Sequence, residues 1–298
     1  MYHKAVLLKE SVEGLNIKPN GIYVDVTFGA GGHSRAILNQ LGPKGQLFAF
    51  DQDKDALINA IDDNRFVLIN QNFKHMTRFL RFYGVSAVDG ILADLGVSSH
   101  QFDKAERGFS IRFDADLDMR MNQELVLSAD QVVNEYEETE LSRVLFQYGD
   151  LRQSRAMAKE IVSQRTKAPI KTINQLKIAL KKFLNHRKEN KILAQVFQAI
   201  RIEVNQEIEV LKSFLSQVPD LLKDKGRLST ISYHSIEDRL VKRFIRSGLF
   251  EGEPERDLFG NYEVPLKKVG NLITPTNKEI EQNNRARSAK LRIAEKIS

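Results

Sequence analysis

The sequence predicts an α/β fold, with a mostly parallel sheet and an inserted all-helical subdomain. Short apolar runs alternate with helix-like stretches over the first hundred residues, which is typical of βαβ units. One more strand-like run follows only at residues 226–233. The stretch between is helical in pattern and nearly free of glycine, and it is too long for a connection inside one compact unit. We therefore expect a sheet whose chain is interrupted by a separate helical region.

The first four strands are predicted from buried apolar runs. These runs are residues 21–27 (GIYVDVT), 45–50 (GQLFAF), 65–70 (RFVLIN) and 88–95 (VDGILADL). Helices are expected between them, at residues 34–40, 54–62 and 76–82. Strands joined through helices in this way lie parallel in one sheet.

The second half of the sheet is predicted to follow the helical region. Residues 226–233 (GRLSTISY) indicate the fifth strand, residues 234–245 (HSIEDRLVKRFI) a helix, and residues 264–273 a last strand or hairpin. We place the sheet domain at 1–110 and 208–298, and the helical domain at 111–207.

The composition excludes several kinds of site. The chain has 298 residues and a net charge of +6, but it has no cysteine. Disulfides, zinc–thiolate sites, iron–sulfur clusters and cysteine nucleophiles are thereby excluded, and no metal site is predicted. No apolar run approaches the roughly 20 residues of a membrane span, and the start lacks a signal-peptide core. These features predict a cytoplasmic protein with no membrane partner.

Basic residues gather in the helical region and in the C-terminal tail. Residues 151–191 hold twelve Lys and Arg against two acids, Glu160 and Glu189. The twelve are Arg152, Arg155, Lys159, Arg165, Lys167, Lys171, Lys177, Lys181, Lys182, Arg187, Lys188 and Lys191. The tail, residues 285–296 (RARSAKLRIAEK), is also rich in cations. Both segments are predicted to contact an anionic partner such as RNA; the competing interpretation is a solvated lysine-rich helix face.

A glycine loop after the first strand predicts a nucleoside-type cofactor. Residues 25–34 read DVTFGAGGHS, and glycines there let the backbone turn and approach a ligand. Asp51 follows the second strand, where a carboxylate can accept hydrogen bonds from both ribose hydroxyls. The alternative is a turn that the chain requires for steric reasons, with no ligand.

The details of the loop favour S-adenosylmethionine. The dinucleotide pattern is incomplete because Ser34 stands where a third small residue is expected, and a phosphate-binding loop would need a lysine before it. Asp25, before the glycines, suits a cofactor with an amino group and no phosphate. A nicotinamide-dependent oxidoreductase stays open as the alternative enzyme class.

Ten motifs follow one another along nearly the whole chain. They are residues 3–10 (HKAVLLKE), 25–34 (DVTFGAGGHS), 51–53 (DQD), 94–101 (DLGVSSHQ), 107–110 (RGFS), 117–121 (LDMRM), 197–201 (FQAIR), 204–205 (VN), 232–239 (SYHSIEDR) and 285–292 (RARSAKLR). On these motifs the sequence closely resembles the RsmH/MraW family of S-adenosylmethionine-dependent 16S rRNA methyltransferases. It departs from the family at Ala5, in place of Pro, and at residues 114–116 (DAD) and 283–285 (NNR), in place of Asp-Gly-Pro and Asn-Pro-Arg.

The resemblance implies a fold, a reaction and a cofactor site. The fold is a Rossmann-like class I methyltransferase sheet with an inserted helical, substrate-recognising domain. The reaction is methyl transfer to the exocyclic N4 of a cytidine in the decoding centre of 16S rRNA, in the small ribosomal subunit; a homodimer is left open. The cofactor contacts carried over motif by motif are Gly31, Gly32, His33, Asp51, Phe73, Asp94 and Gln101.

Three residues are candidates for the reaction itself: Asp94, Ser98 and His234. Asp94 ends the fourth strand and either binds the methionine end of the cofactor, which the resemblance favours, or faces the amine. Ser98 is a candidate contact to the base, against a turn or helix-cap role. His234 lies at the sheet rim where ligands bind, although a lone histidine is more often structural.

Two further expectations concern the base and the class of protein. Phe109 and Tyr233 are aromatic candidates for sandwiching a flipped base, against simple core packing. A non-catalytic alternative is an rRNA-binding assembly factor with a degenerate pocket, which the intact Asp25, Gly31 and Asp51 argue against. Because carbon-5 methylation of cytosine needs a cysteine, the absence of cysteine favours a nitrogen or oxygen nucleophile.

Overall fold

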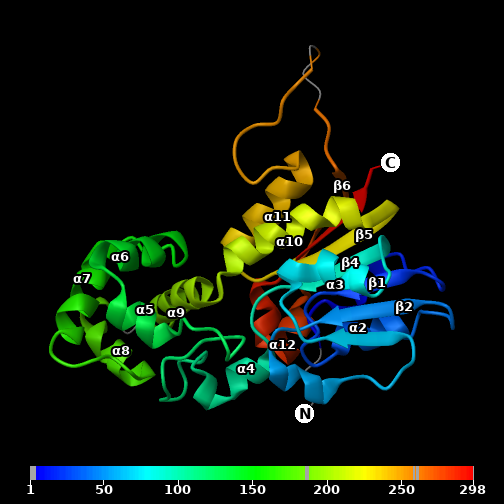
Figure 1. Ribbon diagram of the computed structural model, residues 1–298. Coiled ribbons are helices and arrows are strands. Elements are labelled where there is room, and N and C mark those ends of the chain that lie inside the picture. Colours follow the sequence, from blue (N-terminus) through cyan, green and yellow to red (C-terminus); the bar gives the residue numbers. More distant parts are fainter. Residues whose placement is uncertain (1–4, 185–187, 258, 260–261, 298) are drawn as a thin grey trace. The chain divides into compact units, whose positions relative to one another are not determined.

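The computed structural model describes residues 5–184, 188–257, 259 and 262–297, and the chain divides into two compact units (Figure 1). The sheet unit is Met1–Gly96 with Glu209–Ser298, and the helical unit is Val97–Ile208. The boundary expected at residue 110 differs from this division, because Phe109 is buried in the core of the helical unit, with Val97 and Phe102 packed against it.

The sheet unit contains one seven-stranded sheet. Its strands are β1 (Ile22–Asp25), β2 (Gln46–Phe50), β3 (Phe66–Ile69), β4 (Val88–Asp94), β5 (Leu222–Ser232), β6 (Leu266–Ile273) and β7 (Lys290–Lys296). The order is β3-β2-β1-β4-β5-β7-β6; the first five are parallel, and β7 runs antiparallel to β5 and β6. This arrangement confirms the expected Rossmann-like α/β sheet.

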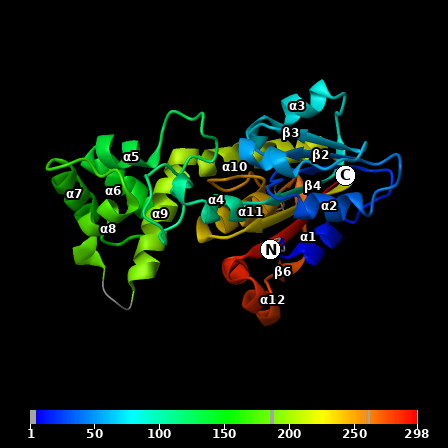
Figure 2. The ribbon, with the colours of Figure 1, turned by 90° about the horizontal axis from the view of Figure 1, so that it is seen from below.

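Helices cover both faces of this sheet. They are α1 (Leu8–Gly14), α2 (Gly32–Leu38), η1 (Lys54–Asn59), η2 (Phe73–His75), α3 (Met76–Phe82), most of α10 (Glu207–Leu221), α11 (Ser235–Ser247), α12 (Asn277–Gln282) and η5 (Asn284–Ser288). Figure 2 shows α3 and α10 on one side of the strands and α1 and α2 on the other. Because β4 is covered on both faces, every residue in it except Asp94 is buried.

Alternating residues of each strand enter two different cores. Phe50 and Ile91 pack with Leu80 of α3 and Phe214 of α10. Tyr23 and its neighbours in β2 and β4 pack instead with side chains of α1 and α2. The period-two alternation of a strand explains this division.

The five predicted strands are confirmed, but the tail differs from expectation. Residues 54–62 form only a 3-10 helix, η1, and the basic tail contains β7, which was not predicted as a strand. Lys290 Nζ and Arg292 Nε lie 3.2 and 2.7 Å from the carboxylate of Asp238 on α11. Two tail cations are therefore neutralised inside the sheet unit.

The helical unit has a hydrophobic core of its own. Its helices are α4 (Ser99–Asp103), η3 (Ala105–Arg107), α5 (Ala129–Glu135), α6 (Glu138–Gln147), α7 (Ser154–Arg165), α8 (Ile173–Ala179), η4 (Lys181–Phe183) and α9 (Glu189–Asn205). Val132, Leu145, Ile161 and Ile200 are fully buried at its centre. Arg187, and His3 and Lys4 of the first motif, lie outside the described residues. In the described ranges, no helix combines the length and the apolar character needed to cross a membrane.

Candidate functional site

The candidate site is built at one edge of the sheet unit. β1, β2, β4 and β5 are parallel, so their carboxyl ends meet at the same edge (Figure 1). Asp25 ends β1, Asp51 follows β2, Asp94 ends β4 and Tyr233 follows β5. Ligands of open α/β sheets bind at this edge.

The glycine loop needs its glycines for steric reasons. Gly31 caps α2 with a φ of 76°, in the left-handed region that favours glycine. A Cβ there would lie 2.6 Å from Nη1 of Arg35 and 2.9 Å from the ring of Phe28. A Cβ on Gly32 would lie 3.0 Å from that of Ala5. The turn and its close packing therefore require glycine at Gly31, and they leave little room for a side chain at Gly32.

Asp25 holds this loop in place. Its Oδ1 accepts a hydrogen bond from the backbone N of Thr27 at 3.1 Å, and its Oδ2 accepts one from Oγ of Ser34 at 2.7 Å. Burial raises the pKa of this carboxyl above its ordinary value. The hydrogen bonds assign Asp25 a role in shaping the loop between β1 and α2.

Asp51 is oriented by backbone donors. Its Oδ2 accepts from the N of Gly29 at 2.8 Å, and its Oδ1 accepts from the N of Asp53 at 2.9 Å. Burial raises its pKa to about 6, and these two hydrogen bonds oppose the rise. A carboxylate held in this way still has unused lone pairs, so it can accept hydrogen bonds from the two hydroxyls of a ribose.

Asp94 is brought together with two other side chains of the site. Tyr233 donates its hydroxyl to Oδ1 of Asp94 at 2.7 Å, and Nδ1 of His33 lies 3.8 Å from Oδ2. The backbone N of Asp94 donates to Oγ1 of Thr27 at 2.6 Å. Burial raises the pKa of Asp94 to about 6, although His33 and the Tyr233 hydroxyl both favour the ionised form.

Tyr233 was a candidate for stacking on the base, and the structure shows a contact for it that was not expected. Its hydroxyl hydrogen-bonds to Asp94, and burial together with that carboxylate raises the pKa of the phenol well above its ordinary value. The sequence did not reveal this partnership, because the two residues come from β4 and β5, far apart in the chain. Adjacent strand ends in a βαβ sheet are the only signal that points to it.

His33 and Phe73 complete the part of the site in the sheet unit. His33 is buried, and its Nε2 lies 3.2 Å from the carbonyl oxygen of Val6. Phe73 follows β3 and is half-buried, with its ring edge-on to Phe214 at a centroid distance of 5.4 Å. An aromatic ring that is only partly covered, at the end of a parallel strand, can pack against an adenine.

Ser98 and Gln101 lie in the helical unit, where they cap α4. Oγ of Ser98 accepts from the N of Gln101 at 3.2 Å, and Oε1 of Gln101 accepts from the N of Ser98 at 3.1 Å. These reciprocal bonds form a capping box. The cap interpretation of Ser98 therefore has a structural basis, while its contact with the base stays a prediction, as does the cofactor contact of Gln101.

Phe109 is 4% exposed and lies in the core of the helical unit. The guanidinium of Arg107 lies 5.9 Å from its ring centroid. Core packing, the commoner role weighed for this aromatic, is what the structure shows.

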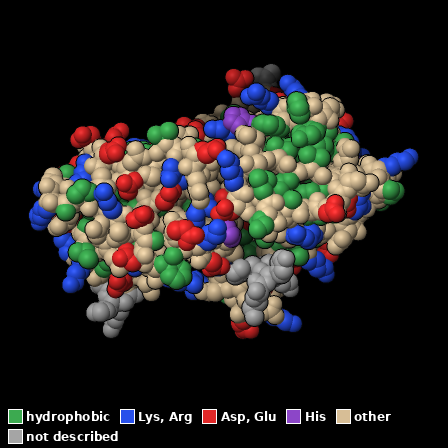
Figure 3. All heavy atoms as spheres, turned by 60° about the horizontal axis from the view of Figure 1, so that its bottom comes forward, with side chains coloured by type: hydrophobic (Ala, Val, Ile, Leu, Met, Phe, Trp, Pro, Cys, Tyr) green, Lys and Arg blue, Asp and Glu red, His purple; other side chains and the backbone are tan. Residues whose placement is uncertain are grey.

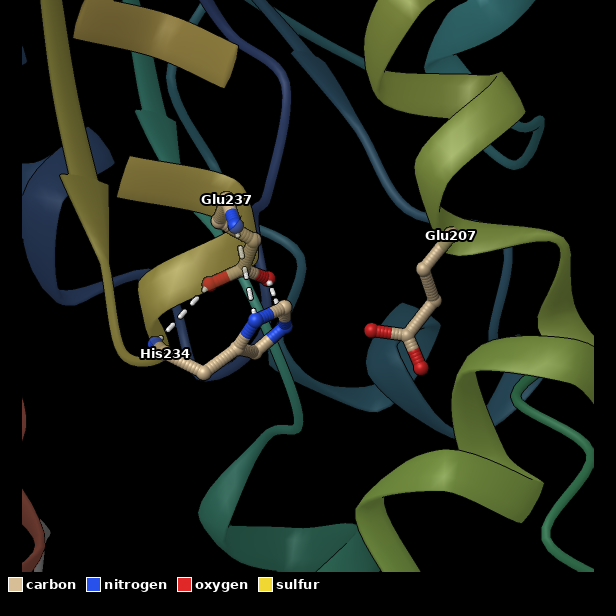
Figure 4. A group of neighbouring side chains, drawn as sticks. All are labelled: Glu207, His234 and Glu237. Atoms are coloured by element: carbon tan, nitrogen blue, oxygen red, sulfur yellow. Dashed lines mark hydrogen bonds and ion pairs between the residues drawn. The ribbon is translucent and has the colours of Figure 1, made fainter. Parts of the chain in front are cut away.

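His234 caps α11 (Figure 4). Its Nδ1 accepts from the N of Glu237 at 3.4 Å, and its Nε2 is buried, 3.0 Å from Oε1 of Glu237 without the alignment of a hydrogen bond. Glu237 also accepts from the backbone N of Tyr233 at 3.0 Å. His234 thus has a structural role as a cap, and its catalytic role stays a prediction.

Glu237 was missed in the sequence, although an acid three residues after a cap is a recognisable signal. It fixes the backbone that carries Tyr233, the partner of Asp94. Glu207, also drawn in Figure 4, belongs to the helical unit and pairs there with Arg201 at 2.7 Å.

A family model, described as the MraW methylase family, matches residues 1–297. The chain belongs to this family. Ribosomal RNA small subunit methyltransferase H of Christiangramia forsetii is 66% identical over 296 residues, covering 99% of this chain and 98% of that protein. The protein of the same name from Flavobacterium johnsoniae is 65% identical, with the same coverage. A solved rRNA methylase of Streptococcus thermophilus is 13% identical, with a TM-score of 0.44 and full coverage of both chains.

Membership in the MraW methylase family settles the class of enzyme. The chain is an S-adenosylmethionine-dependent methyltransferase, and the nicotinamide-dependent alternative is wrong. The loop at Gly31 and the oriented carboxylate of Asp51 fit the methionine and ribose parts of such a cofactor. The individual roles of the site residues stay predictions.

Proposed function

We propose that this methyltransferase transfers the methyl group of S-adenosylmethionine to the exocyclic N4 of a cytidine in the decoding centre of 16S rRNA, in the small ribosomal subunit. The observation that carries the proposal is the position of Asp94, a partly buried carboxylate held at the end of β4 by Tyr233 and by the backbone contact to Thr27. The names of the curated relatives, ribosomal RNA small subunit methyltransferase H, support the choice of RNA.

The sheet unit orients the methyl donor. Asp51 accepts hydrogen bonds from the ribose, Phe73 packs against the adenine, and the turn at Gly31, Gly32 and His33 holds the methionine end. The donor supplies a methyl group on a positively charged sulfur. Most of the rate of such a displacement comes from aligning nucleophile, methyl carbon and sulfur, which rigid contacts of this kind provide.

Asp94 has the chemistry to assist the amine. The N4 lone pair of cytosine is delocalised into the ring, so a nearby acceptor helps to localise it on nitrogen. A carboxyl with a pKa of about 6 is mostly ionised at neutral pH and takes a proton more readily than an ordinary aspartate. As the carbon–nitrogen bond forms and the carbon–sulfur bond breaks, the amine becomes cationic and releases a proton, which Asp94 accepts or passes to water.

The helical unit is proposed to bind the RNA. Arg152, Arg155, Lys159, Lys171 and Lys191 are exposed on it, although Figure 3 shows acidic side chains among the basic ones. Such contacts to phosphates weaken as salt rises. The target base must also leave its stack to reach a buried site. A ribosomal substrate places the protein in the cytoplasm, and a homodimer stays open to measurement in solution.

The test is methyl transfer onto small ribosomal subunits that lack the modification, followed by nucleoside mass spectrometry. N4-methylcytidine is expected with the natural chain and is expected to be lost with Asp51→Asn. Formation of 5-methylcytidine or of a 2′-O-methyl nucleoside alone would refute the proposed chemistry. An Asp51→Asn variant that still restores the cellular effect would favour the non-catalytic assembly factor instead.

A further inference from the structure

The exposed side of α3 combines cations with aromatic rings. Lys74, Arg78, Arg81, Phe82 and Tyr83 are all exposed, and we call these five residues the α3 face. Lys74 lies in η2 just before α3, and Tyr83 is the C-cap residue of α3. Within α3, Arg81 and Phe82 stand three and four positions after Arg78 and so share a side of the helix with it. The aromatic rings thus lie among the cations rather than apart from them.

Phe82 is not required by the core, whereas the ring of its neighbour Tyr83 lies 5.6 Å from that of the buried Phe48. Met76 and Leu80 anchor the opposite side of α3 and are fully buried, and Phe79 packs edge-on against Phe50. Phe82, by contrast, is 82% exposed and contacts the 45% exposed Tyr83 edge-on at 5.3 Å. Figure 3 shows that hydrophobic side chains also gather on the surface of the sheet unit. Exposed aromatic pairs of this kind point to a binding partner.

In the part of the chain that the structure describes, no acidic side chain pairs with the cations of the α3 face. Residues 71–88 contain Lys74, Arg78 and Arg81 and no Asp or Glu. Within the ranges that the structure describes, none of these three side chains forms an ion pair, whereas Lys182 and Lys290 elsewhere have acidic partners. The pKa of His75 beside them is lowered by partial burial and by the positive charge of Lys74 and Arg78. An anionic partner therefore fits this surface.

We infer that the α3 face is an RNA-binding surface of the sheet unit, which stacks an unpaired base of the substrate on Phe82 and holds adjacent phosphates with Lys74, Arg78 and Arg81. Interleaved cations and exposed rings are what single-stranded nucleic acid requires, since phosphates and base faces alternate along it. This inference rests on the proposed RNA substrate. It adds a contact separate from the helical unit and from the residues of the methyl-transfer site.

The position of α3 suits this role. Phe73, at the rim, is followed directly by Lys74, and α3 then leads away from the rim to the turn at Gly84 before β4. RNA that follows this face starts beside the cofactor edge and continues along the sheet unit. The α3 face therefore binds nucleotides other than the methylated one, so its loss affects affinity more than the chemical step.

The experiment measures binding without methyl transfer, so that it does not depend on the reaction. Small subunits lacking the modification and deproteinised 16S rRNA are titrated with the natural chain, with Phe82→Ala and with the double variant Arg78→Gln/Arg81→Gln. Phe259→Ala is the control for the ring, since Phe259 is 89% exposed and belongs to the sheet unit, away from α3 in the sequence. Lys9→Gln is the control for the charge, since Lys9 faces Glu13 at 3.8 Å.

Phe82→Ala is expected to weaken binding to both RNA probes about 10-fold, the scale of one stacked base. The double variant is expected to lower the slope of log affinity against log salt by about 1.5. The melting temperature and the affinity for S-adenosylmethionine should not change, and both controls should bind as the natural chain does.

Two results would overturn the inference. One is unchanged affinity and salt slope in the α3 variants. The other is weaker binding to intact subunits with no change on deproteinised 16S rRNA, which would assign the α3 face to a ribosomal protein. Failure of the natural chain to form N4-methylcytidine would count against the proposed reaction alone, because the binding titration is independent of it.

Discussion

The two units of the chain use their buried polar side chains differently. In the sheet unit, Asp25, Asp51 and Asp94 are gathered at one edge, where burial raises their pKa values. In the helical unit, Asn205 is buried but satisfied, since its amide donates to the carbonyl of Met119 and accepts from the N of Met121. Clustered carboxylates that burial destabilises indicate a binding function, whereas a satisfied amide indicates structure.

The largest expected effect of this difference is on cofactor affinity. Asp51→Asn removes the charge that we propose accepts hydrogen bonds from the ribose, and hydrogen bonds to charged groups contribute about 1.5–3 kcal/mol each. We expect S-adenosylmethionine to bind roughly 100-fold more weakly by isothermal titration. Glu203→Gln, which alters a carboxylate bonded to Tyr136 in the helical unit, serves as the control and should bind normally. Equal losses in both variants would show that the two units are not functionally distinct.

An intermediate effect is expected from pH. Because the pKa of Asp51 is about 6, cofactor affinity should fall as the pH is lowered from 7 to 5 and this carboxylate gains a proton. The rate of methyl transfer should fall over the same range, because the pKa of Asp94 is also about 6. The stability of the free protein changes in the opposite sense. Carboxyls whose pKa is raised on folding bind protons more tightly when folded, so stability decreases as the pH rises from about 4 to 6.

Tyr233→Phe tests the cause of this pH dependence. Loss of the hydroxyl removes a hydrogen bond that favours ionised Asp94, so the pH midpoint of the methyl-transfer rate should move to higher pH. Tyr136→Phe removes a tyrosine–carboxylate bond in the helical unit and should leave the midpoint unchanged. An unchanged midpoint in Tyr233→Phe would mean that its bond to Asp94 has no role in the methyl-transfer step.

The smallest expected effect is at Ser98. As the cap of α4, Ser98→Ala should lower the free energy of unfolding by about 1 kcal/mol, and Ser98→Asp should restore it. Chemical denaturation measures both, and single-turnover kinetics measure the methyl-transfer step. A much slower transfer in Ser98→Ala at unchanged stability would instead support the predicted contact to the base.

Sequence reasoning recovered the parts of the fold that depend on local pattern. The parallel strands were predicted from short apolar runs, and the clearest of these is β4, which is buried except at Asp94. β7 was missed because its cations resembled those of a solvated tail, although they are only half-exposed and Leu291 and Ala294 are fully buried. Its cations are paired only through contact with α11, and no local pattern reveals such a partner.

The candidate site also has parts that local sequence patterns predicted and parts that only tertiary contacts determine. The glycine loop and Asp51 were found from their spacing, and the structure gives each a geometry that suits a nucleoside cofactor. The bond between Tyr233 and Asp94 depends on which strand ends are neighbours, and the role of His234 as a cap depends on the conformation of one residue. Both the Tyr233–Asp94 bond and the role of His234 depend on the folded structure, so the sequence alone could not establish them.

The sheet order also has a consequence for synthesis on the ribosome. β4 emerges early, but its neighbour β5 follows only after the whole helical unit, and β7, which pairs with β5, is the last strand of the chain. The edge of β4 that later pairs with β5 therefore stays unpaired while the helical unit is synthesised. The helical unit is rich in local contacts and can fold during this time. The cofactor edge, whose Tyr233 follows β5, is completed only late in translation, so a chain that stops before residue 222 would carry the glycine loop without the residue that orients Asp94.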